Sequence, residues 1–188
     1  FPWYSDDQPV LWWSPDPRGI LPLDRFHVSR RLRRTIRQGR FEVTCDRAFR
    51  DVMVGCGSAA GRIANTWVTP AMVEAYVRLH RLGYAHSVET WRDGRLVGGT
   101  YGVSIAGLFA AESKFFRERD ASKVALAYLV KHLERRGYSL LDIQMVTPHT
   151  ARLGAMEISR AEYLRRLAAA LGRAVSFGDR LSVGANDF

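Results

Sequence analysis

The stretch AHSVETWRDGRLVGGTYGVSIAGLFAAESKF, residues 85–115, decides the fold class of this 188-residue chain. Turn signals divide it into runs of strand-forming residues. The dipeptide Asp93-Gly94 favours a two-residue hairpin turn, and Gly107 marks another turn. The stretch therefore predicts a β-meander.

Helical segments flank the meander on both sides. Thr69 is a candidate N-cap, Pro70 suits the first helical position, and Gly83 is a stop signal. Ser159 and Glu162 have the spacing of a capping box. The expected helices span residues 47–57, 69–83, 120–137 (from an Asp120 cap to a Gly137 stop) and 159–172, and the further strands span residues 40–46 and 138–146. This order of elements predicts a mixed α/β (α+β) fold.

The composition favours a polyanion as partner. Lysine and arginine number 28 against 19 acidic residues, and the net charge of +9 suits nucleic acid or anionic lipid. No run of about 18 apolar residues is present, so we expect no membrane span. Cys45 and Cys56 lack a CxxC or metal spacing, which predicts reduced thiols in a cytoplasmic protein. The chain does not begin with Met, which suggests a missing upstream segment.

An arginine-rich helix is expected within residues 26–41. Leu32 and Ile36 lie four residues apart and form a narrow core-facing stripe. No acidic residue stands between Arg25 and Glu42 to balance the arginines by i, i+4 pairing. An unbalanced arginine face suits phosphate, although an ordinary solvated helix face is the alternative. The arginines of this run are Arg30, Arg31, Arg33, Arg34, Arg37 and Arg40.

Three polar residues interrupt the expected strands. Asp142 and Gln144 are two residues apart, so their side chains point to one face of a strand. An ordinary solvent-facing pair is the alternative interpretation. Glu112 ends an apolar strand before a basic stretch, and two carboxylates near strand ends in a basic protein suggest a site for a cationic group. No GxSxG, zinc spacing, Walker loop or dinucleotide fingerprint accompanies them.

Motifs along the chain resemble one family. The motifs that follow in order are FPWYS, LWWSPDPRG, TWVT, MVEAY..LH..GYAHSVE.W, LVGG.YGV, ES.F, ASK.AL and D.Q with H...LGA..I.R..YL. Together they resemble the bacterial leucyl/phenylalanyl-tRNA–protein transferases from Phe1 to about Leu171. In that family a short region precedes the FPW motif, which agrees with a missing upstream segment here.

The resemblance implies both fold and reaction. The expected core is that of the GCN5-related acetyltransferases, a mixed, mostly antiparallel sheet flanked by helices. The expected enzyme is an aminoacyltransferase that needs no cofactor and no metal. It would move Leu or Phe, and Met less well, from aminoacyl-tRNA to the N-terminal amine of proteins beginning with Arg or Lys, which marks them for degradation.

The resemblance also implies the site residues. Gln144 would orient the attacking amine, Asp142 would fix the Gln144 amide or take part in the proton's departure, and Glu112 would pair with the acceptor's positive end. The residues expected to bind tRNA are Trp3 and Trp67 at the terminal adenosine and Arg30, Arg31 and Arg34 at the acceptor stem. Trp12 and Trp13 are either packing or lining residues.

The pocket for the Leu or Phe side chain is expected at four positions, namely Phe109, Lys114, Leu126 and Val130. Lys114 departs from the family pattern, which has Met at this position. A buried ammonium is costly. Either the lysine stem lines the pocket while its head reaches water, or the donor preference differs.

Two other functions compete with aminoacyl transfer. An acyl-CoA-dependent N-acetyltransferase needs a glycine-rich pyrophosphate loop before residue 121, and RERDAS (117–122) has no glycine. A non-catalytic RNA-binding module would explain the arginines and aromatic residues but not the acids. We expect an aromatic and arginine-rich portion at residues 1–62 and an acetyltransferase-like catalytic domain at 63–188.

Overall fold

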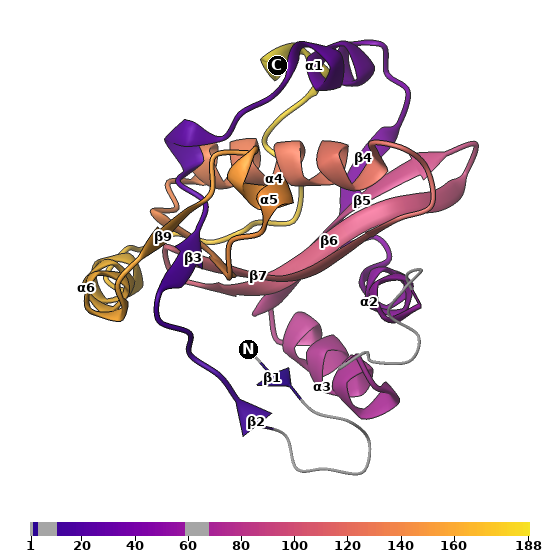
Figure 1. Cartoon of the computed structure of the whole chain (residues 1–188). Helices are drawn as coiled ribbons and strands as arrows, with labels where there is room; N and C mark the ends of the chain where they lie inside the picture. Colours follow the sequence, from indigo (N-terminus) through magenta and orange to yellow (C-terminus); the bar gives the residue numbers. More distant parts are fainter. Residues whose placement is uncertain (1, 4–10, 59–67) are drawn as a thin grey trace.

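The computed structural model describes residues 2–3, 11–58 and 68–188, with side chains described from residue 11 onward. A seven-stranded sheet forms its centre (Figure 1), with strand order β4-β5-β6-β7-β8-β3-β9. Among these described strands only the β7–β8 pairing is parallel, so the predicted mixed, mostly antiparallel sheet is confirmed. The strands are β3 (Arg18–Ile20), β4 (Glu42–Cys45), β5 (Ala85–Arg92), β6 (Arg95–Ile105), β7 (Leu108–Phe116), β8 (Leu140–Gln144) and β9 (Met156–Ile158), while β1 (Pro2–Trp3) and β2 (Leu11–Trp12) form a separate antiparallel ribbon.

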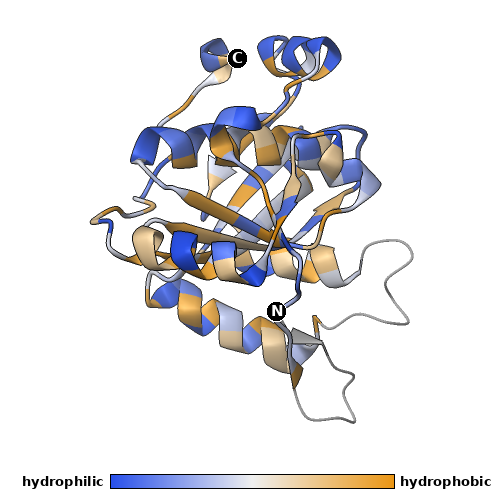
Figure 2. Ribbon diagram, turned by 60° about the vertical axis from the view of Figure 1, so that its left-hand side comes forward, coloured by the Kyte–Doolittle hydropathy of each residue, from blue (hydrophilic) through white to orange (hydrophobic). Residues whose placement is uncertain are grey.

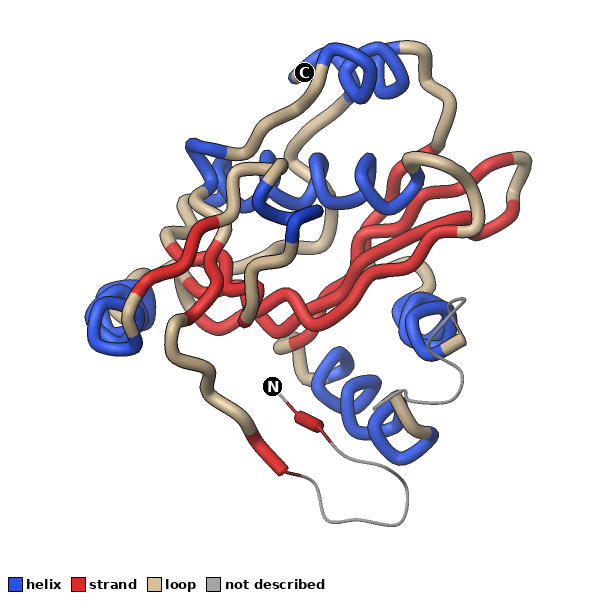
Figure 3. The backbone as a smooth tube through the Cα atoms, viewed as in Figure 1, coloured by secondary structure: helices blue, strands red, loops and turns tan. Residues whose placement is uncertain are grey.

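Helices cover both faces of the sheet (Figure 3). Helix α4 packs on one face over a cluster that includes Phe109, Leu129 and Leu141. Helices α2, α3 and α6 pack on the other face over two further clusters. The helices are η1 (Leu23–Arg25), α1 (Arg30–Arg37), α2 (Phe49–Gly57), α3 (Pro70–Arg81), α4 (Ala121–Arg136), α5 (Pro148–Ala151), α6 (Arg160–Leu171) and η2 (Ala185–Asp187).

The N-cap residues expected from the sequence mark the starts of three helices. The side-chain oxygens of Ser29, Thr69 and Ser159 each accept a backbone N–H of the first turn, as N-caps do. Asp120 stands at the N-cap position of α4, as predicted, but its side chain does not cap the helix. Asp120 has φ 70° and makes no cap hydrogen bond, because its carboxylate is bound to the side chains of Arg31 and Lys123.

The meander folds as its turns predict. Strands β5 and β6 meet at Asp93 and Gly94, whose φ angles of 50° and 71° lie in the left-handed region. Strands β6 and β7 meet at the turn that contains Gly107. Strands β5, β6 and β7 thus form one long antiparallel ladder, with β4 on one side of it and β8, β3 and β9 on the other.

The first third of the chain supplies strands to the same sheet. Strand β4 extends the sheet beyond β5, and β3 lies between β8 and β9. Strands from residues 1–62 and 63–188 therefore share one sheet. No helix in the described ranges is long and apolar enough to cross a membrane.

Candidate active site

The three predicted polar residues meet where one ladder of the sheet ends. The parallel pairing of β7 and β8 stops at Ala110 and Asp142, while β7 continues to Phe116. Glu112 lies just beyond this point on β7, and Gln144 ends β8. The end of a parallel ladder thus places all three side chains within one region.

A β-bulge sets the direction of Glu112. Tyr101 on β6 pairs with Ser113 and Gly102 pairs with Ala111, so Glu112 is the extra residue between them. A Cβ at Gly102 would lie 2.3 Å from the Ala110 carbonyl oxygen, so only glycine fits beside the bulge. The bulge turns Glu112 towards α3, where its carboxylate interacts with Tyr76.

The environment of Glu112 disfavours its charge. Its Oε2 atom is shielded from solvent and has no hydrogen-bond partner in the described part of the chain, although the residue as a whole is only partly buried. Burial is the main cause that raises the pKa of Glu112 to about 7, and the negative charge of Asp142 adds to it, against the lowering effects of the N-terminal amino group, Tyr76 and Arg18. A carboxyl with this pKa exchanges its proton near neutral pH.

Asp142, in contrast to Glu112, has hydrogen-bond donors at both of its carboxylate oxygens. It is buried, and Arg18 binds it through two contacts, Nε to Oδ1 at 3.0 Å and Nη2 to Oδ2 at 2.6 Å. The Tyr163 hydroxyl donates to Oδ2 at 2.8 Å, and the Gln144 backbone N–H donates to Oδ1 at 2.9 Å. The alternative of a solvent-facing Asp142–Gln144 pair is therefore wrong.

Gln144 is held in an unusual backbone conformation. Its φ of 62° lies in the left-handed region, which costs a residue with a side chain on the order of 1 kcal/mol. Gly19 on β3 pairs with Gln144, and a Cβ there would lie 2.7 Å from the Met145 carbonyl carbon. The close strand and the bond to Asp142 together hold this conformation.

Sequence reasoning missed three residues of this site. Arg18, Tyr163 and Tyr76 come from β3, α6 and α3, and only tertiary pairing brings them together. Arg18 also lies 4.7 Å from the centre of the Tyr163 ring. All three stand in motifs that carried the family resemblance, namely LWWSPDPRG, MVEAY and YL, and this was the available signal.

The predicted aminoacyl-pocket residues lie on the other face of the sheet. Phe109, Leu126 and Val130 are buried together in the cluster under α4. Lys114 points to the same face but lies farther along β7, opposite Thr100, and is only partly buried. Burial lowers the pKa of His149 on α5, and the charge of Lys114 lowers it further, so the ammonium lies towards α5.

The predicted adenosine site is only partly described. Trp67 lies outside the described residues. The backbone of Trp3 pairs with Leu11 in the β1–β2 ribbon, and its side chain lies outside the description. Trp12 and Trp13 are 69% and 54% exposed, so neither is a core residue.

The predicted arginine-rich helix is α1, and its arginines differ in whether they form ion pairs. Leu32 and Ile36 are buried as predicted. Arg31 is not unbalanced, because Asp120 at the start of α4 binds it. Arg30 and Arg34 are exposed and form no ion pair with any described residue. In Figure 2 this helix, beside the C-terminus, is coloured mostly hydrophilic.

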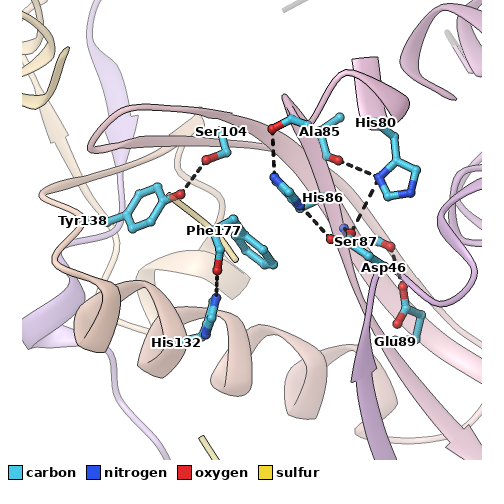
Figure 4. A network of polar contacts seen from close by, with 11 residues as sticks. Asp46, His80, Ala85, His86, Ser87, Glu89, Ser104, His132, Tyr138 and Phe177 are labelled. Atoms are coloured by element: carbon cyan, nitrogen blue, oxygen red, sulfur yellow. Dashed lines mark hydrogen bonds and ion pairs between the residues drawn. The ribbon is translucent and has the colours of Figure 1, made fainter. Parts of the chain in front are cut away.

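A second polar network, away from the site, has a structural role (Figure 4). The His86 Nδ1 atom lies 2.7 Å from Asp46 Oδ2, and the Ser87 backbone N–H donates to the same carboxylate. His80 Nδ1 lies 2.8 Å from the Ala85 carbonyl oxygen. These bonds join α3, β5 and the end of β4. No cluster of three metal-binding side chains occurs among the described residues.

Comparisons with known proteins agree on one family. A family model described as leucyl/phenylalanyl-tRNA protein transferase matches residues 20–168, and a model of the N-terminal domain of that transferase matches residues 1–16. The leucyl/phenylalanyl-tRNA–protein transferase of Aromatoleum aromaticum is 53% identical over 168 residues, which are 89% of this chain and 71% of that protein. The protein of the same name from Anaeromyxobacter sp. is 55% identical over 174 residues, 92% of this chain and 74% of that protein.

Similar solved structures are more distant. The structure of L-PGS from Bacillus licheniformis is 13% identical, with a TM-score of 0.48 over 71% of this chain and 46% of that chain. The family model spans most of the chain, and relatives share half of its residues. This chain belongs to the leucyl/phenylalanyl-tRNA–protein transferase family.

Proposed function

We propose that this chain transfers leucine or phenylalanine, and methionine less well, from aminoacyl-tRNA to the N-terminal amine of proteins that begin with Arg or Lys. The observation that carries the proposal is the set of Glu112, Asp142 and Gln144 at the end of the β7–β8 ladder. An acceptor with N-terminal Arg brings two positive charges, and a sheltered carboxylate in a basic protein suits such a group.

The chemistry needs little beyond positioning. An activated ester becomes an amide, so the reaction needs neither ATP nor a cofactor. An N-terminal amine has a pKa of about 7.7–8.0, so part of it is a free nucleophile at neutral pH. Good positioning of two reactants can contribute roughly 7–11 kcal/mol. In this proposal the Gln144 side-chain oxygen accepts a hydrogen bond from the amine and aims its lone pair.

The nucleic-acid side of the proposal rests on α1 and on the aromatic residues. Arg30 and Arg34 are exposed and available for phosphate oxygens of the acceptor stem. Trp3 and Trp67 would stack on the terminal adenosine, a contact worth about 1–3 kcal/mol per base. Arg31 contributes less in this proposal, since it is already bound to Asp120.

The pocket for the transferred side chain is proposed behind the same ladder end. Phe109 pairs with Leu141, one residue before Asp142, and packs with Leu126 and Val130 in the α4 cluster. Lys114 would contribute only its stem, which agrees with its partial exposure.

An acyl-CoA-dependent acetyltransferase is the weaker candidate. Such an enzyme would bind a pyrophosphate at the N-terminus of α4. Here Asp120 holds that position, and its carboxylate would oppose a second anion. The loop before α4 also lacks glycine.

One assay tests the proposal. The protein is incubated with Phe-tRNA and a peptide that begins with Arg, and the mass of the peptide is then measured by mass spectrometry. We expect a mass gain of one Phe residue. The same peptide with an acetylated N-terminus is the control and should gain nothing. Transfer from acetyl-CoA, or no gain with the free peptide, would contradict the proposal.

A further inference from the structure

Asp142 has no hydrogen-bonding capacity left for a substrate proton. An ionised carboxylate offers about four lone-pair positions. Two of them receive Arg18, one receives Tyr163, and one receives the backbone N–H of Gln144. All four donors are fixed by buried elements of the sheet or by α6. A proton arriving at Asp142 would have to displace one of these donors.

Glu112 has the capacity that Asp142 lacks. Its Oε2 atom is sheltered from solvent and has no hydrogen-bond partner among the described residues. The charged or titratable groups that act on it are the N-terminal amino group of this chain, Asp142 from β8, Tyr76 from α3 and Arg18 from β3. A buried oxygen without a donor is costly for folding, and such sites persist where function needs them.

We propose that the two carboxylates divide the transfer reaction between them. Arg18 and Tyr163 are positioning residues that fix Asp142 as the support of Gln144, and Glu112 is the residue that takes the proton from the attacking amine. This inference rests on the proposed function and replaces Asp142 by Glu112 in the movement of the proton.

The proposed step balances. The neutral amine of the acceptor attacks the carbonyl carbon of the aminoacyl ester, so that a C–N bond forms. The amine proton passes to Glu112 Oε2. The bond from the carbonyl carbon to the ribose 3′-oxygen then breaks, and Glu112 returns the proton to that oxygen. The products are the extended peptide and tRNA with a free 3′-hydroxyl, and Glu112 is again ionised.

Arg18 and Tyr163 would affect the reaction through only two further residues, Asp142 and Gln144. Both hold Asp142, and Asp142 holds the backbone N–H of Gln144 in its left-handed conformation. Loss of the Tyr163 hydroxyl would loosen Asp142 and so misalign the Gln144 side chain. That effect is expected in kcat, while binding of aminoacyl-tRNA stays the same.

The first test needs no substrate. In protein labelled with ¹³C at glutamate side-chain carboxyls, NMR titration follows each carboxyl with pH, and the signal missing from Glu112→Gln identifies Glu112. We expect this one carboxyl to titrate near neutral pH. Titration in the ordinary range of glutamate would overturn the inference.

The second test is kinetic and uses three variants. Glu112→Gln should lower kcat roughly 100-fold or more, the usual effect of losing a general base, with the KM for Phe-tRNA unchanged. Tyr163→Phe should lower kcat by about tenfold without moving the pH dependence of the rate. Tyr138→Phe is the matched control, because it removes another buried hydroxyl that bonds Ser104 away from the site, and it should leave kcat unchanged.

The outcomes separate the two proposals. If the wild type transfers Phe and Glu112→Gln keeps its kcat, or loses only affinity for the peptide, Glu112 is no proton acceptor and the inference fails alone. If the wild type transfers nothing, the proposed function fails and the inference fails with it. If Tyr138→Phe lowers kcat as much as Tyr163→Phe does, the positioning role of Tyr163 is refuted.

Discussion

The environment of Glu112 lowers the stability of the fold but would suit the proposed proton transfer. The bulge in β7 turns this carboxyl towards α3, where one oxygen is sheltered and has no donor within the described chain. The native protein therefore disfavours the ionised form, which raises the pKa from the ordinary value of 4.5 to about 7. If Glu112 has the proposed role, the protein keeps a reactive group at the expense of stability, as is common at functional sites.

This cost predicts a pH-dependent gain in stability for Glu112→Gln. Between pH 4.5 and about 7 the native carboxyl binds more protons than the unfolded one, so the free energy of unfolding falls as pH rises. Glutamine mimics the neutral acid and avoids this loss. We expect the variant to exceed wild type by up to about 3 kcal/mol at pH 8 and to match it near pH 4.5, measured by urea unfolding at both pH values. Equal differences at both pH values would contradict the prediction.

Gln144 supports a second prediction at the residue scale. Its side chain is assigned to the attacking amine, while its backbone N–H holds Asp142. Gln144→Ala keeps the backbone bond and removes only the amide. We expect a lower kcat with little change in the KM for Phe-tRNA, measured in the peptide mass assay. A raised KM with an unchanged kcat would assign this side chain to substrate binding.

At the scale of elements, the β7 bulge and helix α1 each have a proposed role, the bulge in directing Glu112 and α1 in binding phosphate. The bulge needs Gly102, whose missing Cβ leaves room for the backbone of the neighbouring strand. Helix α1 needs only a narrow apolar stripe, so its remaining faces are open to carry arginine. In both elements a local feature of the chain determines what the site can hold.

Gly102→Ala should therefore disturb the site from the backbone. The new Cβ would meet the Ala110 carbonyl oxygen at 2.3 Å, and one of the two strands must shift. We expect a loss of stability of about 1–3 kcal/mol and a reduced kcat, because Glu112 moves with the bulge. Gly184→Ala is the control, since no atom lies within 4 Å of the position that its new methyl group would take. Thermal unfolding and the peptide assay of both variants test this.

Helix α1 predicts a salt effect. Arg30 and Arg34 are exposed and make no ion pair with the described residues, whereas Arg31 is bound to Asp120. Replacing Arg30 and Arg34 by Ala should flatten the dependence of tRNA affinity on salt, by roughly 0.9 in the logarithmic slope for each lost phosphate contact. Arg95→Ala, at the exposed start of β6, is the control. A slope that stays the same in the double variant would refute phosphate binding by α1.

At the scale of the whole molecule, the C-terminal segment completes the core. Phe177 is only 2% exposed, and its ring lies 4.2 Å from that of His86 and 5.8 Å from that of Phe109. The His132 Nε2 atom lies 2.9 Å from the Phe177 carbonyl oxygen (Figure 4). One side chain beyond the residues matched by the family model thus joins β5, β7 and α4.

Phe177→Ala should accordingly destabilise the entire fold. Removing a buried phenyl ring typically costs about 3–5 kcal/mol, through lost burial and the cavity that remains. Phe116→Ala is the matched control, since Phe116 is 65% exposed and its loss should change stability by less than about 0.5 kcal/mol. Urea unfolding followed by circular dichroism measures both. Similar values for the two variants would show that Phe177 is not a core residue.

The sequence by itself determined the features that depend on neighbouring residues. Asp93-Gly94 made the hairpin turn because those residues adopt left-handed φ angles readily. Ser29, Thr69 and Ser159 capped their helices because an N-cap needs only the next three residues. The sequence also predicted that Glu112, Asp142 and Gln144 form one site. Alternation along a strand and the order of the family motifs can both be read directly from the chain.

Only the tertiary structure decided what surrounds those residues. Strand β3 is three residues long and carries no periodic signal, yet it inserts between β8 and β9 and brings Arg18 onto Asp142, 124 residues away. Asp120 likewise lost its expected cap role to Arg31, 89 residues away. Such partners are chosen by long-range packing. For that reason the sequence predicted two carboxylates at one site, and only the fold showed that Asp142 accepts four hydrogen bonds while Glu112 keeps one oxygen without a hydrogen-bond partner among the described residues.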